Sequence, residues 1–226
     1  MSHQINITRI RAVSNALGDL KDQVVFVGGA TVSLYATRAA IETRVTNDVD
    51  IAVELGSYKK YIELEEQLRK MGFQNDTTGH IGRFLLEGLI VDVIPTDEKV
   101  LGFSNIWYKE GFQTAQDYTI DPQHVVKIFS PPYFIASKFE AFKGRKPKED
   151  PRASQDLEDI VFVLENRTPI WDEMRSVQGT IRDYLLSEFR NLYNNPHIEE
   201  LIDGHAGIKS PSSAYFILED MENFIR

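Results

Sequence analysis

Two short stretches decide the fold of this chain: residues 24–29, which read VVFVGG, and residues 46–51, which read TNDVDI. The first is an apolar run that ends in a pair of glycines, which is typical of a buried strand followed by a turn. In the second stretch, Asp48 and Asp50 are two residues apart. In a strand their carboxylates therefore point to one face, and the apolar residues between and after them point to the other.

A third carboxylate lies in a later apolar run. Residues 90–94 read IVDVI, so Asp92 points away from its apolar neighbours. If this strand lies beside the strand of Asp48 and Asp50, three carboxylates converge. Ionised carboxylates repel one another, so the cluster is unfavourable unless a cation neutralises it. Mg²⁺ suits such a site, and two ions can hold the attacking and leaving oxygens of an in-line displacement. The alternative is a pair of aspartates on a solvated strand edge.

Gly28 and Gly29 follow one predicted strand and precede a predicted helix. Without Cβ atoms, their backbone can approach a triphosphate closely, and the start of a helix offers unpaired N–H groups and a positive dipole end. An ordinary tight turn would have the same sequence. Only the aspartates that follow favour a phosphate site.

Composition limits the classes of protein that remain. The chain has 226 residues, a formal net charge of −9 and no cysteine, so disulfides and thiolate sites are excluded. No apolar run approaches the roughly 18–20 residues that span a bilayer, and the first residues lack the features of a secretory signal. We therefore expect a cytoplasmic protein without a membrane partner. The acidic charge argues against broad nucleic-acid binding, although residues 143–148 form a basic segment that suits either RNA or solvent.

Apolar periodicity and turn residues predict an α/β (α+β) fold of two domains. Residues 1–130 would form an α/β core with a short mixed sheet flanked by helices, and residues 131–226 a helical C-terminal domain. The predicted strands are 24–27, 49–53, 84–86, 89–94, 114–120 and 125–129. The predicted helices are 5–20, 30–40, 58–71, 133–142, 154–165, 171–193 with a break at Gly179, 197–202 and 213–224.

The residues of the first domain resemble the nucleotidyltransferases of the DNA polymerase β-like superfamily. The family pattern is an apolar residue with two glycines, then Asp-x-Asp, then a third acidic residue on a later strand. Residues 27–29, Asp48, Asp50 and Asp92 match each part. Residues 44–50, which read RVTNDVD, are similar to the motif of the AbiEii-like subgroup, which includes toxins of bacterial toxin–antitoxin and phage-abortive systems.

The second domain is also similar to that subgroup. Residues 132–142 match its helix that carries a lysine, here Lys138, and residues 156–160 match its Asp-x-x-Asp helix. The subgroup commonly has a lysine immediately before the first aspartate of that helix, where this chain has Gln155. The departure leaves the role of this position open and does not affect the three aspartates.

The resemblance implies a role for each matched residue. Asp48, Asp50 and Asp92 would be the catalytic residues and would bind two Mg²⁺ ions, with Asp92 helping to deprotonate the attacking hydroxyl. The NTP would be bound by Gly28, Gly29, Arg44, Lys138 and Asp156. Lys138 would reach the triphosphate, and Asp156 would contact the nucleotide or orient Lys138. Asp159 would pair with Lys138 or Arg145.

Three functions follow from the resemblance. The first is an AbiEii-like toxin that transfers NMP from NTP to RNA such as tRNA and is restrained by an antitoxin protein. The second is a nucleotidyltransferase that acts on a small molecule such as an antibiotic, or on a protein. The third is a nucleotide-binding module without turnover. The acceptor, the preferred base and the oligomeric state do not follow from the sequence.

Overall fold

The computed structural model describes residues 2–38, 43–145, 150–207 and 213–226. The chain divides into two compact units. The first comprises residues 1–34 and 42–130, and the second comprises residues 35–41 and 131–226. Each unit is described by itself.

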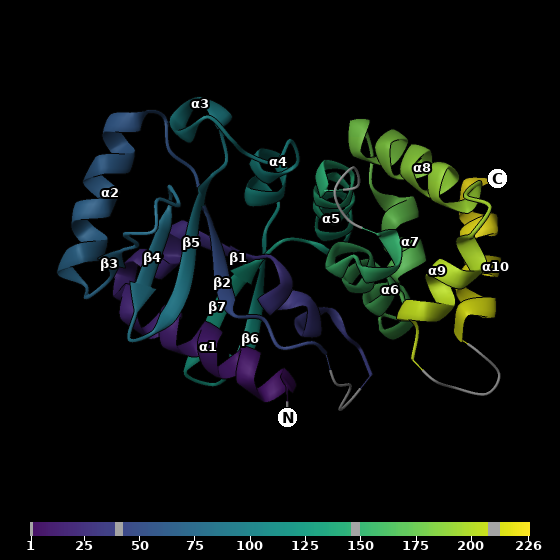
Figure 1. Cartoon of the computed structure of the whole chain (residues 1–226), viewed down its shortest axis with the longest axis horizontal. Helices are drawn as coiled ribbons and strands as arrows, with labels where there is room; N and C mark the ends of the chain where they lie inside the picture. Colours follow the sequence, from purple (N-terminus) through teal and green to yellow (C-terminus); the bar gives the residue numbers. More distant parts are fainter. Residues whose placement is uncertain (1, 39–42, 146–149, 208–212) are drawn as a thin grey trace. The chain divides into compact units, whose positions relative to one another are not determined.

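The first unit is built on a seven-stranded mixed sheet with the strand order β3-β4-β5-β2-β1-β7-β6 (Figure 1). Strands β2 and β5 are parallel, as are β1 and β7, and the other neighbouring strands are antiparallel. All four residues of β1 are buried, as expected for a strand inside a sheet. The strands are β1 (Val24–Val27), β2 (Asp48–Val53), β3 (Gln74–Asn75), β4 (Arg83–Leu86), β5 (Leu89–Pro95), β6 (Gln116–Asp121) and β7 (His124–Ile128).

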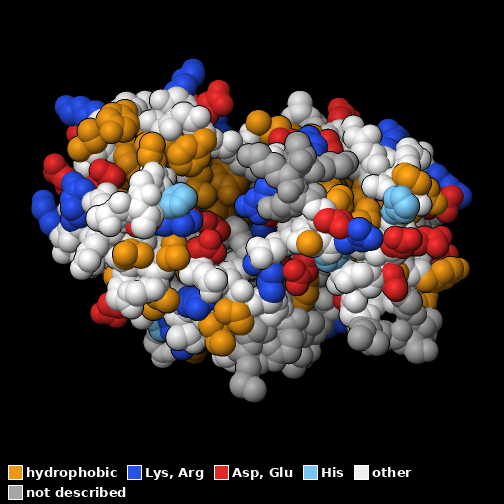
Figure 2. All heavy atoms as spheres, in the orientation of Figure 1, with side chains coloured by type: hydrophobic (Ala, Val, Ile, Leu, Met, Phe, Trp, Pro, Cys, Tyr) orange, Lys and Arg blue, Asp and Glu red, His pale blue; other side chains and the backbone are white. Residues whose placement is uncertain are grey.

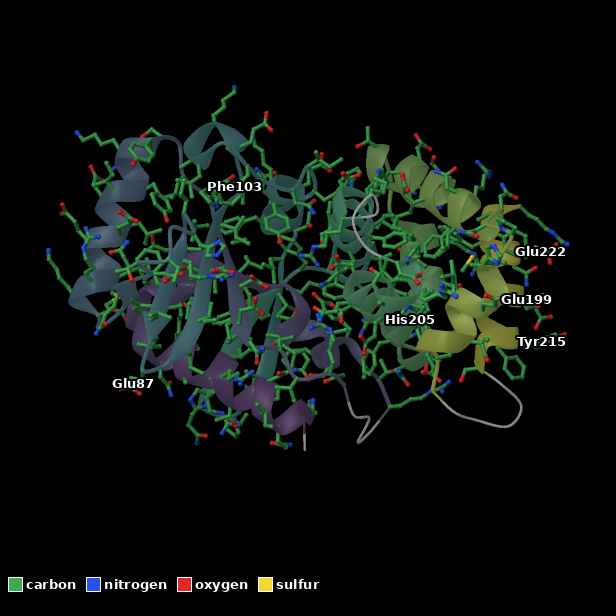
Figure 3. All side chains as sticks on the ribbon, in the orientation of Figure 1. Glu87, Phe103, Glu199, His205, Tyr215 and Glu222 are labelled. Atoms are coloured by element: carbon green, nitrogen blue, oxygen red, sulfur yellow. The ribbon has the colours of Figure 1, made fainter. Side chains whose placement is uncertain are left out.

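Strands β4 and β5, which correspond to the predicted strands 84–86 and 89–94, form a hairpin. Glu87 and Gly88 form its two-residue turn, and both have positive φ angles, 49° and 87°. Such angles are typical of the turns that match the twist of paired strands. Figure 3 shows Glu87 at the tip of this hairpin. The turn fixes the register of β4 against β5, which sets Arg83 opposite Asp92.

Helices flank this sheet. Helix α1 (Ser2–Leu17) contacts β2 and β7, and the 3₁₀ helix η1 (Gly18–Gln23) follows it. Helix α2 (Tyr58–Lys70) buries Tyr61, Leu64 and Leu68, which are spaced as on one helical face. Two short helices, α3 (Glu98–Leu101) and α4 (Tyr108–Gln113), contact β5 and β2. The sequence patterns do not predict α3 or α4, because four to six residues are too few for a helical period to be recognised.

The predicted helix over residues 30–40 is wrong in type and length. The structure has a 3₁₀ helix, η2 (Gly29–Tyr35), and residues 39 and 40 lie outside the described residues. The 3₁₀ helix ends at Tyr35 because the backbone groups of residues 35 and 37 bond to residues 166 and 167 instead. The Thr37 N–H donates to the carbonyl of Asn166, and Arg167 donates to the carbonyl of Tyr35. These bonds attach residues 35–37 to the second unit.

The second unit is helical (Figure 1). Its core includes an aromatic cluster in which Phe189 contacts the rings of Phe139, Trp171 and Phe224 at centroid distances of 5.0–5.4 Å. The predicted break at Gly179 separates α7 from α8, and Gly179 has a φ of 80°. The helices are α5 (Pro131–Arg145), η3 (Pro151–Ala153), α6 (Gln155–Asn166), α7 (Ile170–Ser176), α8 (Thr180–Tyr193), α9 (Ile198–His205) and α10 (Ser213–Ile225).

The basic segment of residues 143–148 is partly helical. Lys143 and Arg145 belong to α5, which continues three residues beyond the predicted end at Phe142. The Lys143 ammonium pairs with Glu140 and Glu188, and Arg145 pairs with Asp156. The other two cations of this segment, Lys146 and Lys148, lie outside the described residues. Among the helices that the structure describes, none is both long enough and apolar enough to span a membrane.

Candidate functional site

Three carboxylates meet on neighbouring strands of the first unit. Asp48 and Asp50 lie on β2 and Asp92 on β5, and the parallel register sets Asp50 directly opposite Asp92. One oxygen from each residue lies within 4.8 Å of the others, and all three side chains are half-buried. The convergence predicted from the alternation of the sequence is therefore observed. A cluster of this kind could hold a metal ion, because hard oxygen ligands at short range suit Mg²⁺ or Mn²⁺.

Arg83 on β4 partly compensates this cluster. Its Nε donates to Asp92 Oδ1 at 2.8 Å, and its Nη2 donates to Asp92 Oδ2 at 2.7 Å, a bidentate pair. These hydrogen bonds raise the pKa of Arg83, and the negative charge of Asp48 contributes to the same effect. Each carboxylate oxygen has two acceptor sites, so Asp92 can accept from Arg83 and still ligate a cation. Arg83 thus offsets one negative charge and fixes the orientation of Asp92.

The two glycines leave space for side chains of the site. Gly28 has a φ of 73°, and a Cβ atom there would collide with the carboxylate of Asp50. A Cβ atom on Gly29 would collide with the guanidinium of Arg44. The positive φ and the position of Asp50 therefore favour glycine at residue 28 whether or not a phosphate binds, whereas a side chain at residue 29 would require the Arg44 guanidinium to move. The predicted helix dipole behind the glycines is not observed as such, because η2 is a seven-residue 3₁₀ helix.

Asn6 holds the segment that carries Arg44. This side chain on α1 is fully buried; its amide nitrogen donates to the carbonyl of Arg44 at 3.0 Å, and its amide oxygen accepts from the Thr46 N–H at 3.2 Å. The Thr46 hydroxyl in turn donates to the carbonyl of Asp48 at 3.1 Å. A chain of hydrogen bonds therefore connects α1 to the start of β2. In the sequence, Asn6 can be recognised only as a polar residue beside the apolar positions of α1. This pattern does not indicate that Asn6 binds the segment of Arg44.

Lys138 and Asp156 lie in the second unit, in a buried ionic network. Lys138 is buried, and its Nζ lies 3.2 Å from Asp156 Oδ1 and 2.6 Å from Asp159 Oδ2. Arg145 pairs with the other oxygen of Asp156 at 2.8 Å. Asp156 thus orients Lys138, and Asp159 pairs with Lys138 as well. Lys138 is therefore not a solvent-facing residue of α5.

The structure therefore brings together Gly28, Gly29, Arg44, Asp48, Asp50 and Asp92 in the first unit, and Lys138 with Asp156 in the second. Within the described residues, the three aspartates are the only group of His, Cys, Asp or Glu side chains arranged for a metal. No model of a known protein family matches this chain, and no curated protein matches it.

Asp48→Asn should have opposite effects with and without metal. It removes a charge from the cluster, so in EDTA the melting temperature should rise by roughly 2 °C. Millimolar Mn²⁺ should raise the melting temperature of the wild-type protein, because a ligand that binds only the folded state stabilises it. The variant should lose that rise. Asp117→Asn on β6 is the control, and an equal Mn²⁺ effect in Asp48→Asn would exclude a metal site at the cluster.

Gly28→Ala should displace Asp50. The methyl group occupies the position of the Asp50 carboxylate, and alanine is disfavoured at a φ of 73° by roughly 1–2 kcal/mol. Gly18→Ala is the matched control, since Gly18 has a φ of 52° but no atom within 4 Å of an added Cβ. Both variants should unfold at lower urea concentration, but only Gly28→Ala should lose stabilisation by Mn²⁺. Retention of the full Mn²⁺ effect in Gly28→Ala would contradict this role for the glycine.

Lys138→Met should destabilise the second unit by about 3 kcal/mol, because it removes the buried cation that lies 2.6 Å from Asp159, whereas Asp156 keeps its pair with Arg145. Urea unfolding followed by the fluorescence of Trp171, in a Trp107→Phe background, measures this loss. Lys143→Met on the same helix is the control. The Lys143 side chain is 40% exposed, so its ion pairs contribute at most about 1 kcal/mol. Equal losses for the two variants would show that the Lys138 network contributes little to stability.

Proposed function

We propose that this protein is a metal-dependent nucleotidyltransferase that transfers NMP from an NTP to a hydroxyl acceptor, with RNA as the acceptor class. The observation that supports it most strongly is the convergence of Asp48, Asp50 and Asp92 beside Gly28. Three carboxylates within 4.8 Å of one another are costly without a cation, so their arrangement favours a metal-binding role over a structural one.

The chemistry follows from the sheet order β5-β2-β1. A divalent ion at the aspartates would neutralise negative charge on the α-phosphoryl oxygens and lower the pKa of the acceptor hydroxyl. Asp92, on β5, would orient the acceptor and receive its proton. The triphosphate would lie toward Gly28 and Gly29 at the end of β1, where Arg44 supplies positive charge. Attack of the hydroxyl on the α-phosphorus then forms the new ester and releases pyrophosphate.

The contribution of the protein would be mainly positioning and charge compensation, the terms that dominate phosphoryl and nucleotidyl transfer. Arg83 holds Asp92 from one side, and the Asn6 hydrogen bonds hold the segment of Arg44 from the other. The resemblance of residues 44–50 and 132–160 to AbiEii-like proteins supports RNA as acceptor and an antitoxin as partner. If the resemblance to AbiEii-like proteins extends to the second unit, Lys138 and Asp156 are its nucleotide-binding residues.

A label-transfer assay tests this proposal. Purified protein, Mg²⁺ and each α-³²P-labelled NTP in turn are incubated with total cellular RNA and resolved on a denaturing gel. We expect label in RNA with the wild-type protein, and at least a hundredfold less with Asp48→Asn, because a catalytic metal ligand supplies several kcal/mol. Asp117→Asn should retain activity.

The other outcomes identify the alternatives. Label on the protein, or on kanamycin added in place of RNA, would assign a protein or antibiotic acceptor. Bound NTP without release of pyrophosphate would indicate a nucleotide-binding module. Growth inhibition on expression in bacteria, relieved by Asp48→Asn, would support a toxin. Growth inhibition that persists in folded Asp48→Asn would contradict it.

A further inference from the structure

A pocket of about 420 Å³ lies in the first unit between α2, the segment that joins β3 to β4, and α3. In the space-filling view, hydrophobic side chains gather over α2 and α3 (Figure 2). Two apolar side chains that line the pocket are largely exposed, Tyr58 at 58% and Ile81 at 66%. Val100 and Leu101 add apolar surface from α3. These side chains provide contacts for a flat, apolar group.

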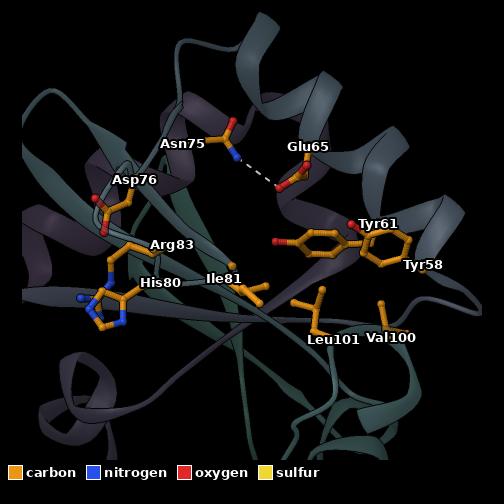
Figure 4. Close-up of a pocket in the computed structure, with 12 residues that line it drawn as sticks. Tyr58, Tyr61, Glu65, Asn75, Asp76, His80, Ile81, Arg83, Val100 and Leu101 are labelled. Carbon is orange, nitrogen blue, oxygen red and sulfur yellow. Dashed lines mark hydrogen bonds between the residues drawn. The ribbon is translucent and has the colours of Figure 1, made fainter.

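The pocket contains a polar group without a partner. Tyr61 is 3% exposed, and its hydroxyl has no hydrogen-bond partner among the described residues. Figure 4 shows this hydroxyl pointing between Asn75 and Glu65 on one side and Ile81 and Leu101 on the other. Burial and the charge of Glu65 raise the pKa of Tyr61, so its hydroxyl stays protonated and can donate. A buried donor without an acceptor is costly, which indicates that a ligand or water supplies one.

Three polar side chains of α2 and β3 near Tyr61 are bonded to one another. Arg69 donates to Asn75 Oδ1 at 2.9 Å, and the Asn75 amide donates to Glu65 Oε1 at 3.1 Å. These bonds connect α2 to β3 and hold one wall of the pocket in place. The Tyr61 hydroxyl, which has no partner among the described residues, is thus available to donate to a hydrogen-bond acceptor on a ligand, and His80 is a further polar side chain of the lining.

The charges that line the pocket disfavour a triphosphate there. Glu65 and Asp76 line it, and Arg83 is the one Lys or Arg among its described lining residues. The Arg83 guanidinium is bound to both oxygens of Asp92. A ligand with several negative charges would therefore be repelled. The pocket suits an uncharged, planar ring that carries an acceptor, which is the chemistry of a nucleobase.

Arg83 also contacts both the pocket and the acidic cluster of Asp48, Asp50 and Asp92. It lines the pocket and holds Asp92, so the pocket adjoins the β5 side of the cluster, whereas Gly28 and Gly29 lie on the β1 side. In an in-line displacement, the attacking and leaving oxygens lie on opposite sides of the phosphorus. A group held in the pocket would thus approach from the side opposite the triphosphate.

We propose that this pocket binds the base of the 3′-terminal nucleoside of the acceptor RNA, with Tyr61 donating to a base acceptor and Tyr58 and Ile81 contacting the ring. The choice of an RNA end over the base of a free NTP rests on the proposed function. The nucleobase chemistry rests on the pocket alone.

Binding can be measured without catalysis. Asp48→Asn protein in EDTA is titrated calorimetrically with homopolymeric pentaribonucleotides of each base, with the four nucleosides, with the four NTPs and with kanamycin. We expect at least one pentaribonucleotide to bind. Tyr61→Phe should weaken it roughly three- to tenfold, the effect of losing one neutral hydrogen bond. Ile81→Ala should weaken it roughly fivefold through lost apolar contact.

Matched variants control for general effects of substitution. Tyr118→Phe on β6 and Ile62→Ala on α2 change residues that do not line the pocket, and they should leave binding unchanged. Tyr61→Phe removes only an unpaired hydroxyl, so its melting temperature should be equal to or above that of the parent. This comparison separates loss of binding from loss of folding.

The possible results test the nucleobase pocket separately from the proposed nucleotidyl transfer. RNA or nucleoside binding that depends on Tyr61 supports the pocket even if label transfer is never observed, in which case only the proposed function fails. NTP binding that depends on Tyr61, without RNA binding, overturns the acceptor assignment. Kanamycin binding alone, or RNA binding unaffected by Tyr61→Phe and Ile81→Ala, overturns the nucleobase pocket.

Discussion

The parallel pairing of β2 with β5 is the constraint on which the candidate site depends. Its register sets Asp50 opposite Asp92, and the two-residue period of a strand brings Asp48 to the same face. A shift of one residue in either strand would turn its carboxylates toward the core and its valines toward solvent. The apolar residues that fix this register, including Val49, Val91 and Val93, are almost fully buried. Burial of the core thus positions the acidic groups.

The surroundings of the cluster follow from that placement. Converging carboxylates need positive charge and space, and the neighbouring strands supply both. Strand β4 contributes Arg83, which holds Asp92, and the end of β1 contributes Gly28, which makes room for Asp50. Next to Gly28, Gly29 makes room for Arg44, whose backbone is held by Asn6. The site is therefore preorganised by secondary structure on several sides, as metal-dependent catalysis would require.

Local patterns in the sequence predict most of the first unit and the aspartate cluster. Alternation of polar and apolar residues identifies β2 and β5, and the Glu87-Gly88 turn identifies the β4–β5 hairpin. Features that depend on distant partners were not predictable in this way. The backbone after Tyr35 bonds to Asn166 instead of continuing a helix, and Arg83 gains its role only from the register with Asp92. The burial of Lys138 likewise depends on two aspartates of another helix.

We propose that Asp48, Asp50 and Asp92 bind divalent metal together with a triphosphate that lies beside Gly28 and Gly29. Anomalous diffraction from crystals grown with Mn²⁺ and a non-hydrolysable α,β-methylene NTP tests it most directly. We expect Mn²⁺ within about 2.5 Å of carboxylate oxygens of the cluster, with triphosphate oxygens completing its coordination. Crystals that contain the nucleotide but show no Mn²⁺ at the three aspartates would contradict it.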